Sequence, residues 1–319
     1  MTMDSTLSHP SSHLASWPDL PLSAWTDTCE TLWRWTQVAG KVRLKSTPLI
    51  NHWWNVTFYV NARGLVAPAN VHGDRTFDIV FDFVDHSVAI EVSDGESESF
   101  ALAPMTVADF YAEFMRRLGR LGLDVHVWTT PSEIEGAVPF DQDRAHAQYD
   151  ARSVSLFHQA LVQSARVMTE FRSGFLGKAS PVHFFWGSFD LAVSRFSGRT
   201  APAPKGHTPN LADWVMAEAY SHEVSSCGFW PGNGGYGRAA FYVYAYPEPA
   251  AYGATRLKTP EAFYDQNLGQ FILPYDAVRT ARDPDATLLG FLQETYEAAA
   301  NLAKWDRSAL ERAAGAKHA

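Results

Sequence analysis

The sequence predicts an α+β fold with two pseudo-equivalent halves, each built from a helix, an antiparallel four-stranded sheet and a second helix. Helical patterns of apolar residues frame each half, and short segments rich in β-branched and aromatic residues lie between them. A similar string also recurs after roughly 135 residues, a period longer than that of solenoid repeats. These observations together indicate two halves that pack around a pseudo-twofold axis.

The first half, residues 17–128, begins with a predicted helix over residues 22–39 that Gly40 ends. Four strands follow, because alternating apolar and polar residues are separated by turn residues. The Asp-Gly pair after the third strand predicts a tight hairpin to the fourth. Thr106 is a typical N-cap and predicts a closing helix over residues 106–123. The four strands cover residues 52–60, 76–84, 87–94 and 97–104.

The second half, residues 151–306, repeats this order after a connector over residues 129–150. Its first helix is predicted over residues 151–176, with Gly174 near its end, and its last helix over residues 285–305. Residues 1–16 are expected to form a flexible N-terminal arm, and residues 307–319 a C-terminal tail. The predicted strands cover residues 183–193, 221–230, 240–248 and 269–278.

The strongest sign of an internal duplication is the segment that follows the first helix of each half. Both segments contain Gly-Lys, a proline, a histidine, two aromatic residues and then Thr-Phe or Ser-Phe, which places His52 opposite His183. The alternative is that two unrelated segments look alike because both contain aromatic strands. A duplicated fold predicts a seam between the halves, and such seams are common places for pockets.

Composition and charge exclude several classes of partner. The 319 residues carry a formal charge of -9, and no run of Lys and Arg alternates with aromatic residues, so nucleic acid is not an expected partner. No apolar run approaches the length needed to span a bilayer, and the N-terminus lacks the pattern of a signal peptide, so a membrane is not expected and a cytoplasmic location is. Cys29 and Cys227 are too few for a disulfide framework.

Several long strings resemble a family of uncharacterised bacterial proteins that is catalogued as a domain of unknown function. The resemblance extends from about Trp17 to Trp305 and is carried by NHWWNVTFYVNARGL, FDFVDH, PFDQDRAHAQYD, SPVHFFWGSFDLAVSRFSGR, YSHEVSSCGFWPG and YAYPEP. It implies a common fold and a common site. It implies no activity, because none is known to us for that family.

Histidines and carboxylates are the first candidates for chemistry. His183 and His222, with Glu223, offer imidazole and carboxylate ligands for a divalent metal such as zinc or iron. His222 and Glu223 are adjacent, so in a strand they point to opposite faces, and no HExxH or paired-cysteine motif supports the site. Structural, hydrogen-bonded histidines are the alternative. The sequence does not identify a cofactor, and a divalent transition metal is one candidate.

The second interpretation needs no metal. His183 or His222 acts as a general acid or base near neutral pH, while Asp190, Glu223 or Tyr220 orients it, and His52 joins from the duplicated segment. Simple alternation along a strand places His183 on the same face as Leu191, among apolar residues, unless a bulge changes the register. The alternative is that these histidines belong to the core.

The expected function is that of an enzyme acting on a small, partly aromatic molecule near the seam, with histidine acid–base or metal-assisted chemistry. The alternative is a protein that binds a small ligand without catalysis; a protein-interaction role needs a large exposed aromatic patch. Phe229, Trp230 and Pro231, in a glycine-rich segment over residues 228–237, are candidates for a lid over the pocket, and the alternative is an ordinary long hairpin loop. The expected ligand-binding residues are Trp54, Trp186, Tyr220, Phe229 and Trp230.

Overall fold

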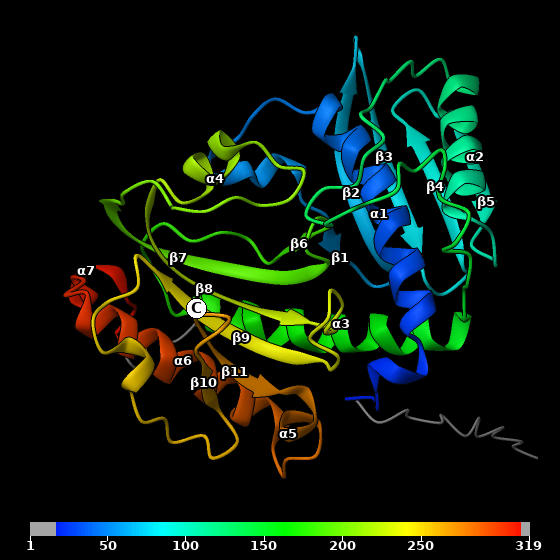
Figure 1. The fold of residues 1–319 in the computed structure, drawn as a ribbon. Coiled ribbons are helices and arrows are strands. Elements are labelled where there is room, and N and C mark those ends of the chain that lie inside the picture. Colours follow the sequence, from blue (N-terminus) through cyan, green and yellow to red (C-terminus); the bar gives the residue numbers. More distant parts are fainter. Residues whose placement is uncertain (1–16, 314–319) are drawn as a thin grey trace, which may run out of the picture.

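The computed structural model describes residues 17–313 and confirms the α+β class: helices cover two antiparallel sheets, one of five and one of six strands (Figure 1). The predicted arm over residues 1–16 lies outside the described residues, as do residues 314–319. Each sheet therefore has more strands than the four that the sequence predicts. Within the described part of the chain, no helix combines the length and the apolar character needed to cross a membrane.

The first sheet is a meander in which each strand pairs with its neighbours in the chain. In its middle strand Phe77, Ile79 and Phe81 are buried while the residues between them are more exposed, as expected for a sheet with one covered face. The helix that follows is capped by the Thr106 hydroxyl, which accepts from the Asp109 amide at 3.0 Å, as predicted. The elements are β1 (Tyr59–Val60), β2 (Gly64–His72), β3 (Arg75–Asp82), β4 (Ser87–Val92), β5 (Ser97–Ala101) and α2 (Val107–Arg120).

The first predicted strand is mostly helical. Residues Asn51–Val56 form a 3₁₀ segment (η2) in which His52 and Trp53 have positive φ angles of 58° and 61°. Hydrogen bonds from both side chains to a distant helix hold this unfavourable backbone. The strand β2 was missed, because Gly64 and Pro68 are typical turn residues; the register of β2 shifts beside Pro68.

Gly40 does not end the first helix. A short 3₁₀ turn, η1 (Leu22–Ala24), leads into α1 (Thr26–Ser46), which continues past Gly40. A Cβ atom at Gly40 would lie 2.3 Å from the ring of Trp186, so the glycine allows that ring to pack directly against the helix backbone. The residue predicted as a helix end is therefore a point of close approach.

The second sheet has the order β10-β11-β9-β8-β7-β6, and α3 and α6 cover one of its faces. The Asp150 side chain caps α3, and Gly174 ends it as predicted. The tail begins with a short helix whose Leu310 carbonyl accepts from the Leu176 amide at 2.7 Å. The elements are α3 (Ala151–Ser173), β6 (His183–Phe185), β7 (Asp190–Thr200), α4 (Asp213–Ala219), β8 (His222–Trp230), β9 (Ala240–Tyr246), η3 (Tyr252–Ala254), β10 (Phe263–Asp265), β11 (Gln270–Pro274), α5 (Tyr275–Arg279), α6 (Pro284–Leu302) and α7 (Arg307–Leu310).

The expected strand over residues 183–193 is a hairpin. His183 pairs with Ala192 and Phe185 pairs with Asp190, across a turn at residues 186–189. Paired residues of antiparallel strands share a face, so His183 lies on the face of Asp190 and not on that of Leu191. The simple alternation was wrong because the chain reverses direction inside the segment.

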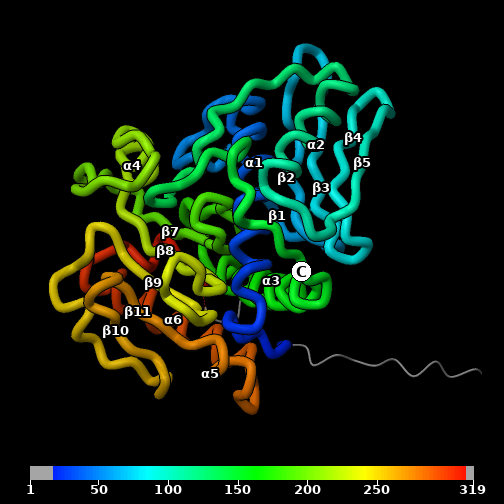
Figure 2. Tube along the Cα trace, turned by 45° about the vertical axis from the view of Figure 1, so that its right-hand side comes forward, coloured from blue at the N-terminus to red at the C-terminus, as the bar shows by residue number. Residues whose placement is uncertain are grey.

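The two sheets meet edge to edge at β1 and β6. The amide of Phe58 donates to the Phe184 carbonyl at 2.9 Å, and the amide of Phe184 donates to the Phe58 carbonyl at 2.8 Å. One continuous core cluster spans both sheets. Helix α1 lies along this seam in Figure 2, and the Trp33 indole donates to the Gly187 carbonyl at 2.7 Å.

Candidate functional site

A cavity of about 630 Å³ lies on the face of the second sheet that α3 and α6 leave uncovered. Its floor consists of β7, β8 and β9, which contribute alternate residues, as a pleated sheet requires. Helix α1 and the connector form one wall, while η2 and α4 form the roof. The floor residues are Asp190, Ala192, Ser194, Phe196, Val224, Ser226, Tyr242 and Tyr244.

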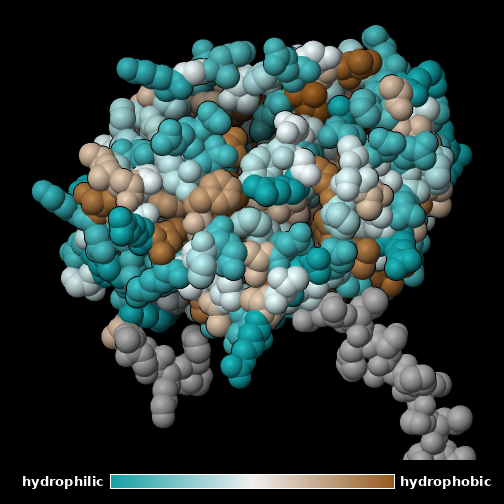
Figure 3. Space-filling model, turned by 60° about the horizontal axis from the view of Figure 1, so that its bottom comes forward, coloured by the Kyte–Doolittle hydropathy of each residue, from teal (hydrophilic) through white to brown (hydrophobic). Residues whose placement is uncertain are grey.

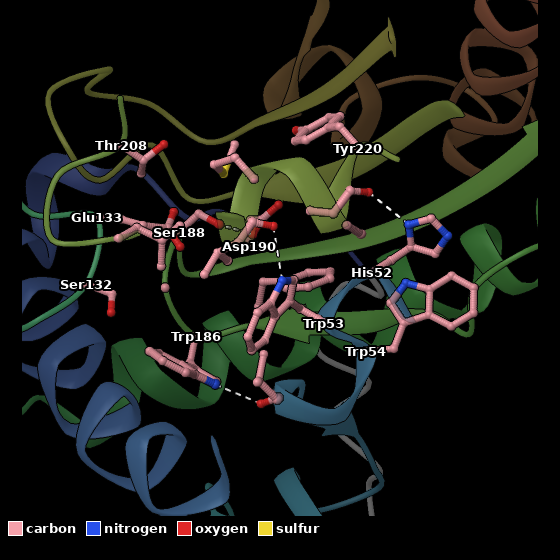
Figure 4. Close-up of a pocket in the computed structure, with 18 of the residues that line it drawn as sticks. His52, Trp53, Trp54, Ser132, Glu133, Trp186, Ser188, Asp190, Thr208 and Tyr220 are labelled. Carbon is pink, nitrogen blue, oxygen red and sulfur yellow. Dashed lines mark hydrogen bonds between the residues drawn. The ribbon is translucent and has the colours of Figure 1, made fainter. Parts of the chain in front are cut away.

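Aromatic rings dominate the rest of the lining, and hydrogen bonds fix two of them. The Trp186 indole donates to the Val56 carbonyl at 2.7 Å, and the Trp53 indole donates to the Val215 carbonyl at 3.0 Å (Figure 4). Rings that are held in this way present a preformed apolar surface. The tryptophans of the lining are Trp53, Trp54, Trp128, Trp186 and Trp214.

Two carboxyl groups share one end of the cavity. Asp190 accepts a hydrogen bond from the Ser188 hydroxyl at 2.8 Å and another from the Tyr242 hydroxyl. Glu133 reaches this point from the connector, where its backbone has a φ of 62° and its amide donates to the Pro209 carbonyl at 2.8 Å. Figure 4 shows Glu133, Ser188 and Asp190 grouped together, with His52 and Trp54 at the opposite end.

The environment of this pair changes its acidity. Burial raises the pKa of Glu133 to about 7, the charge of Asp190 adds to the effect, and Ser188 and Lys41 oppose it. Burial also raises the pKa of Asp190, against the hydrogen bonds from Tyr242 and Ser188. The raised pKa of Glu133 lies near neutral pH, whereas two hydroxyl donors favour the charged form of Asp190.

Lys41 is a cation whose charge acts on Glu133. Its side chain projects from α1 into the wall of the cavity and is only 4% exposed. The ammonium group donates to the Ser132 hydroxyl at 3.0 Å and lies 4.6 Å from the centre of the Trp128 ring. Burial lowers the pKa of Lys41 to about 8, and the charge of Glu133 partly offsets this. The cavity thus combines two acids with one weakly basic amine.

Three tyrosines extend the polar strip across the sheet. The hydroxyls of Tyr220 and Tyr244 lie 2.9 Å apart and share a hydrogen bond, while Tyr242 donates to Asp190. The rings of Tyr242 and Tyr244 are stacked, with centroids 6.1 Å apart. Burial raises the pKa of all three phenols, which are therefore neutral hydrogen-bonding groups at physiological pH.

A second, smaller cavity of about 350 Å³ adjoins the carboxyl pair. Trp230 and Asn233 line it, as does Gly234 from the glycine-rich loop between β8 and β9. The Trp230 indole donates to the Asn233 side chain at 2.8 Å and stacks on Tyr236 at 4.9 Å. Of the two ligand-binding residues predicted in this segment, Trp230 lines this cavity, whereas Phe229 is buried on the opposite face of the sheet.

His52 lines the first cavity, but both of its ring nitrogens are engaged by the protein. Nδ1 lies 2.9 Å from the Ala219 carbonyl, to which it donates, so Nε2 accepts from the Lys178 ammonium at 2.7 Å. Burial lowers the pKa of His52, as does the charge of Lys178. The arrangement fits a neutral histidine that links η2 to α4 and to Lys178.

His183 lies on the same face of the sheet as the floor of the first cavity, but it lines neither of the two spaces. It is 1% exposed, its Nε2 lies 3.3 Å from the Tyr59 hydroxyl, and Nδ1 has no partner among the described residues. Burial and the charge of Arg43 lower the pKa of His183 to about 3. The rings of His52 and His183 both pack on the Trp54 ring, with centroid distances of 5.3 Å and 5.8 Å, and the two histidines have different hydrogen-bond partners.

The other predicted acid–base residues lie apart from the carboxyl pair. The ring of His222 packs edge-on against His52 at 5.6 Å, and Glu223 is held by the Arg199 guanidinium at 2.6 Å on the surface. Among residues 17–313, no group of three or more His, Cys, Asp or Glu side chains is arranged to hold a metal ion. The donor set expected for a transition metal at His183 and His222 is therefore incomplete.

Part of the lining of the first cavity is predictable from the sequence. Trp54, Trp186 and Tyr220, which the sequence predicts as ligand-binding residues, line the first cavity, and so does Asp190, which it predicts as the partner of a histidine. Glu133 was missed, because no periodicity or motif distinguishes it from Glu135 in the connector over residues 129–150. Other lining residues that were not predicted are Lys41, Trp53, Trp128, Trp214, Tyr242 and Tyr244.

Comparisons with known proteins identify the family and nothing beyond it. Neither the curated proteins nor the solved structures contained a match. The model of a family of unknown function, DUF5996, matches residues 17–312. This range covers almost all of the described residues and agrees with the resemblance seen in the sequence. The chain belongs to DUF5996, a family of unknown function.

Proposed function

We propose that this protein is an enzyme that performs general acid–base chemistry on a small, partly aromatic molecule bound in the first cavity. The observation that carries the proposal is the placement of Glu133 and Asp190 at one end of a cavity with aromatic walls. Two acids in unequal surroundings can hold one proton between them and deliver it to a substrate.

The roles follow from the surroundings of each group. Asp190, with two hydroxyl donors, is suited to remain a carboxylate, and Glu133, with a pKa of about 7, is suited to transfer the proton. Lys41 supplies a positive charge beside Glu133 and can hold an anionic group of the substrate. The histidines predicted from the sequence become supports of the site rather than its proton carriers.

The experiment is a comparison of wild type with Glu133→Gln and Asp190→Asn on a panel of 4-nitrophenyl esters, phosphates and glycosides. Loss of a general acid or base lowers kcat by about 10²- to 10⁴-fold. We expect the wild-type pH–rate profile to bend near pH 7 and the Glu133→Gln profile to lose that bend. Binding of panel members by the wild type without turnover of any of them would support the alternative, a protein that binds a small ligand without catalysis.

We also infer an internal duplication, in which the two halves align differently from the alignment that the sequence predicts. Each half has the order helix, five meander strands, helix, if β10 is treated as an addition to the second sheet. The reciprocal hydrogen bonds between Phe58 and Phe184 favour those two residues as equivalents, in place of His52 and His183. A bacterial origin and a cytoplasmic location stay predictions.

A further inference from the structure

We propose that the substrate has two parts, a planar aromatic group held in the first cavity and a small polyhydroxylated group, such as a single sugar ring, held in the second. The inference rests on the proposed function, because it places the bond between the two parts beside Glu133 and Asp190. It adds a binding site in the second cavity and a chemical class of ligand for both cavities.

The two cavities share a wall. Six residues line both spaces, and they include both members of the carboxyl pair. A molecule that fills both cavities must pass along this wall, so its middle lies against the carboxyl groups. The shared residues are Glu133, Ser188, Asp190, Tyr220, Tyr242 and Tyr244.

The two cavities differ in the chemistry of their walls. The first has a volume of about 630 Å³ and walls of indole and phenyl rings, and it opens beside Trp128 and Trp214, whose side chains are 57% and 60% exposed. Flat ring faces bind flat apolar groups by stacking and by removing apolar surface from water. An aromatic or similarly planar group therefore fits the larger space.

The smaller cavity offers amide and hydroxyl groups together with two indole rings. Asn233 is 3% exposed, and its amide donates to the Ser188 carbonyl at 3.3 Å, which ties the loop to the carboxyl pair. Gln270 contributes a second amide from the start of β11. Side-chain amides with tyrosine hydroxyls bind hydroxyl groups, and indole rings pack on the apolar face of a sugar ring.

Glycines give this cavity its shape. In the loop that follows β8, Gly232, Gly234, Gly235 and Gly237 have positive φ angles, and the Gly237 amide donates to the Gly232 carbonyl at 2.8 Å. No atom lies within 4 Å of the position of a Cβ atom at Gly234, which lines the cavity. The loop is thus tightly turned at its base and open at the point that faces a ligand.

The test compares 4-nitrophenol, methyl β-D-glucopyranoside and 4-nitrophenyl β-D-glucopyranoside by calorimetric titration, with the galactoside, mannoside and N-acetylglucosaminide as further conjugates. The protein is Glu133→Gln, so that bound conjugates are not turned over. We expect at least one conjugate to bind about tenfold or more tightly than 4-nitrophenol. The proposal is overturned if every conjugate binds no more tightly than 4-nitrophenol.

Two variants assign the parts of the ligand to the cavities. Gln270→Ala in the second cavity should weaken the best conjugate by about tenfold and leave 4-nitrophenol unchanged. Trp214→Ala at the mouth of the first should weaken 4-nitrophenol and the conjugate alike. Equal effects of Gln270→Ala on both ligands would also overturn the proposal.

Turnover separates the two hypotheses. A wild-type protein that binds conjugates across both cavities without converting any of them would contradict the proposed function and leave the two-part ligand standing. A wild-type protein that converts simple 4-nitrophenyl esters, while the conjugates gain no affinity, would support acid–base catalysis and contradict the two-part ligand.

Discussion

The carboxyl group of Glu133 lies directly against the backbone of Gly187, where a Cβ atom would come within 2.0 Å of Oε1. Gly187 belongs to the hairpin turn between β6 and β7, and its carbonyl accepts hydrogen bonds from Trp33 and Gln37 of α1. Sheet, helix and connector therefore meet where the acid is held. The absence of a side chain at residue 187 fixes the position of that acid.

Gly187→Ala is expected to displace the Glu133 carboxyl with little effect on folding. The clash is with the end of a flexible side chain, and the φ angle of Gly187 is not among the positive ones, so alanine fits the backbone. If Glu133 carries the proton, kcat falls about tenfold or more for a displacement of this kind, and the bend near pH 7 moves. Steady-state kinetics and thermal unfolding check this. An unchanged pH–rate profile would count against Glu133.

Tyr242→Phe should raise the pKa of Asp190 further, because it removes a hydrogen bond to the carboxylate. A hydrogen bond to a charged group contributes about 1.5–3 kcal/mol, which corresponds to roughly 1–2 pKa units. Observation of the Asp190 carboxyl carbon by NMR titration measures the shift. Tyr244→Phe is the matched control, since Tyr244 stacks on Tyr242 but bonds to Tyr220. An equal shift in both variants would contradict the assignment.

Gly40→Ala should destabilise the protein by about 1–3 kcal/mol, since the added methyl group overlaps the Trp186 ring. That ring cannot move freely, because its indole is bonded to the Val56 carbonyl. Chemical denaturation measures the change. Gly290→Ala in α6 is the control: no atom lies within 4 Å of its added Cβ, and helix propensity predicts a gain of up to about 1 kcal/mol.

His183 should make the fold sensitive to acid. Its folded pKa of about 3 lies below the unfolded value of about 6.5, so the unfolded chain binds a proton first as the pH falls. Between pH 7 and pH 4.5 this proton linkage lowers the free energy of unfolding by about 3 kcal/mol. His183→Asn removes the titrating group, and its stability should depend less on pH over this interval by about that amount.

The matched control for this prediction is His126→Asn, because His126 is an exposed histidine. This variant shows the effect of replacing histidine by asparagine at an exposed position. The proton linkage of Glu133 has the opposite sign, because its raised pKa makes the folded protein more stable as the pH falls. Glu133 is present in all three proteins, so its contribution cancels when they are compared. Parallel curves for wild type and His183→Asn would contradict a buried neutral histidine.

Elements with local signals were predictable from the sequence. The capped helices α2 and α3 and the strands β3 to β5 follow from residue spacing and caps that act within a few residues. The segment from Asn51 to Val56 was not, because distant partners in α4 hold its backbone. The β6–β7 turn was misassigned because aromatic residues, which are typical of strands, continue through it at Trp186 and Phe189.

The residues of the candidate site also divide into those that the sequence predicts and those that it does not. Aromatic residues and Asp190 could be recognised in the sequence as candidates because such side chains are conspicuous near predicted strands. Glu133 could not, because a loop places it there through a left-handed backbone and a bond to Pro209. Its acidity also depends on burial and on Asp190, neither of which a linear sequence displays.

The paired backbone groups of Phe58 and Phe184 protect one edge of each sheet from association with other chains. β1 and β6 are edge strands, whose open sides invite pairing with a neighbour and aggregation. In the whole molecule each open side faces the other, and two reciprocal hydrogen bonds occupy the point of contact. A fragment cut within the connector would expose both sides at once, so neither half is suited to exist alone in solution.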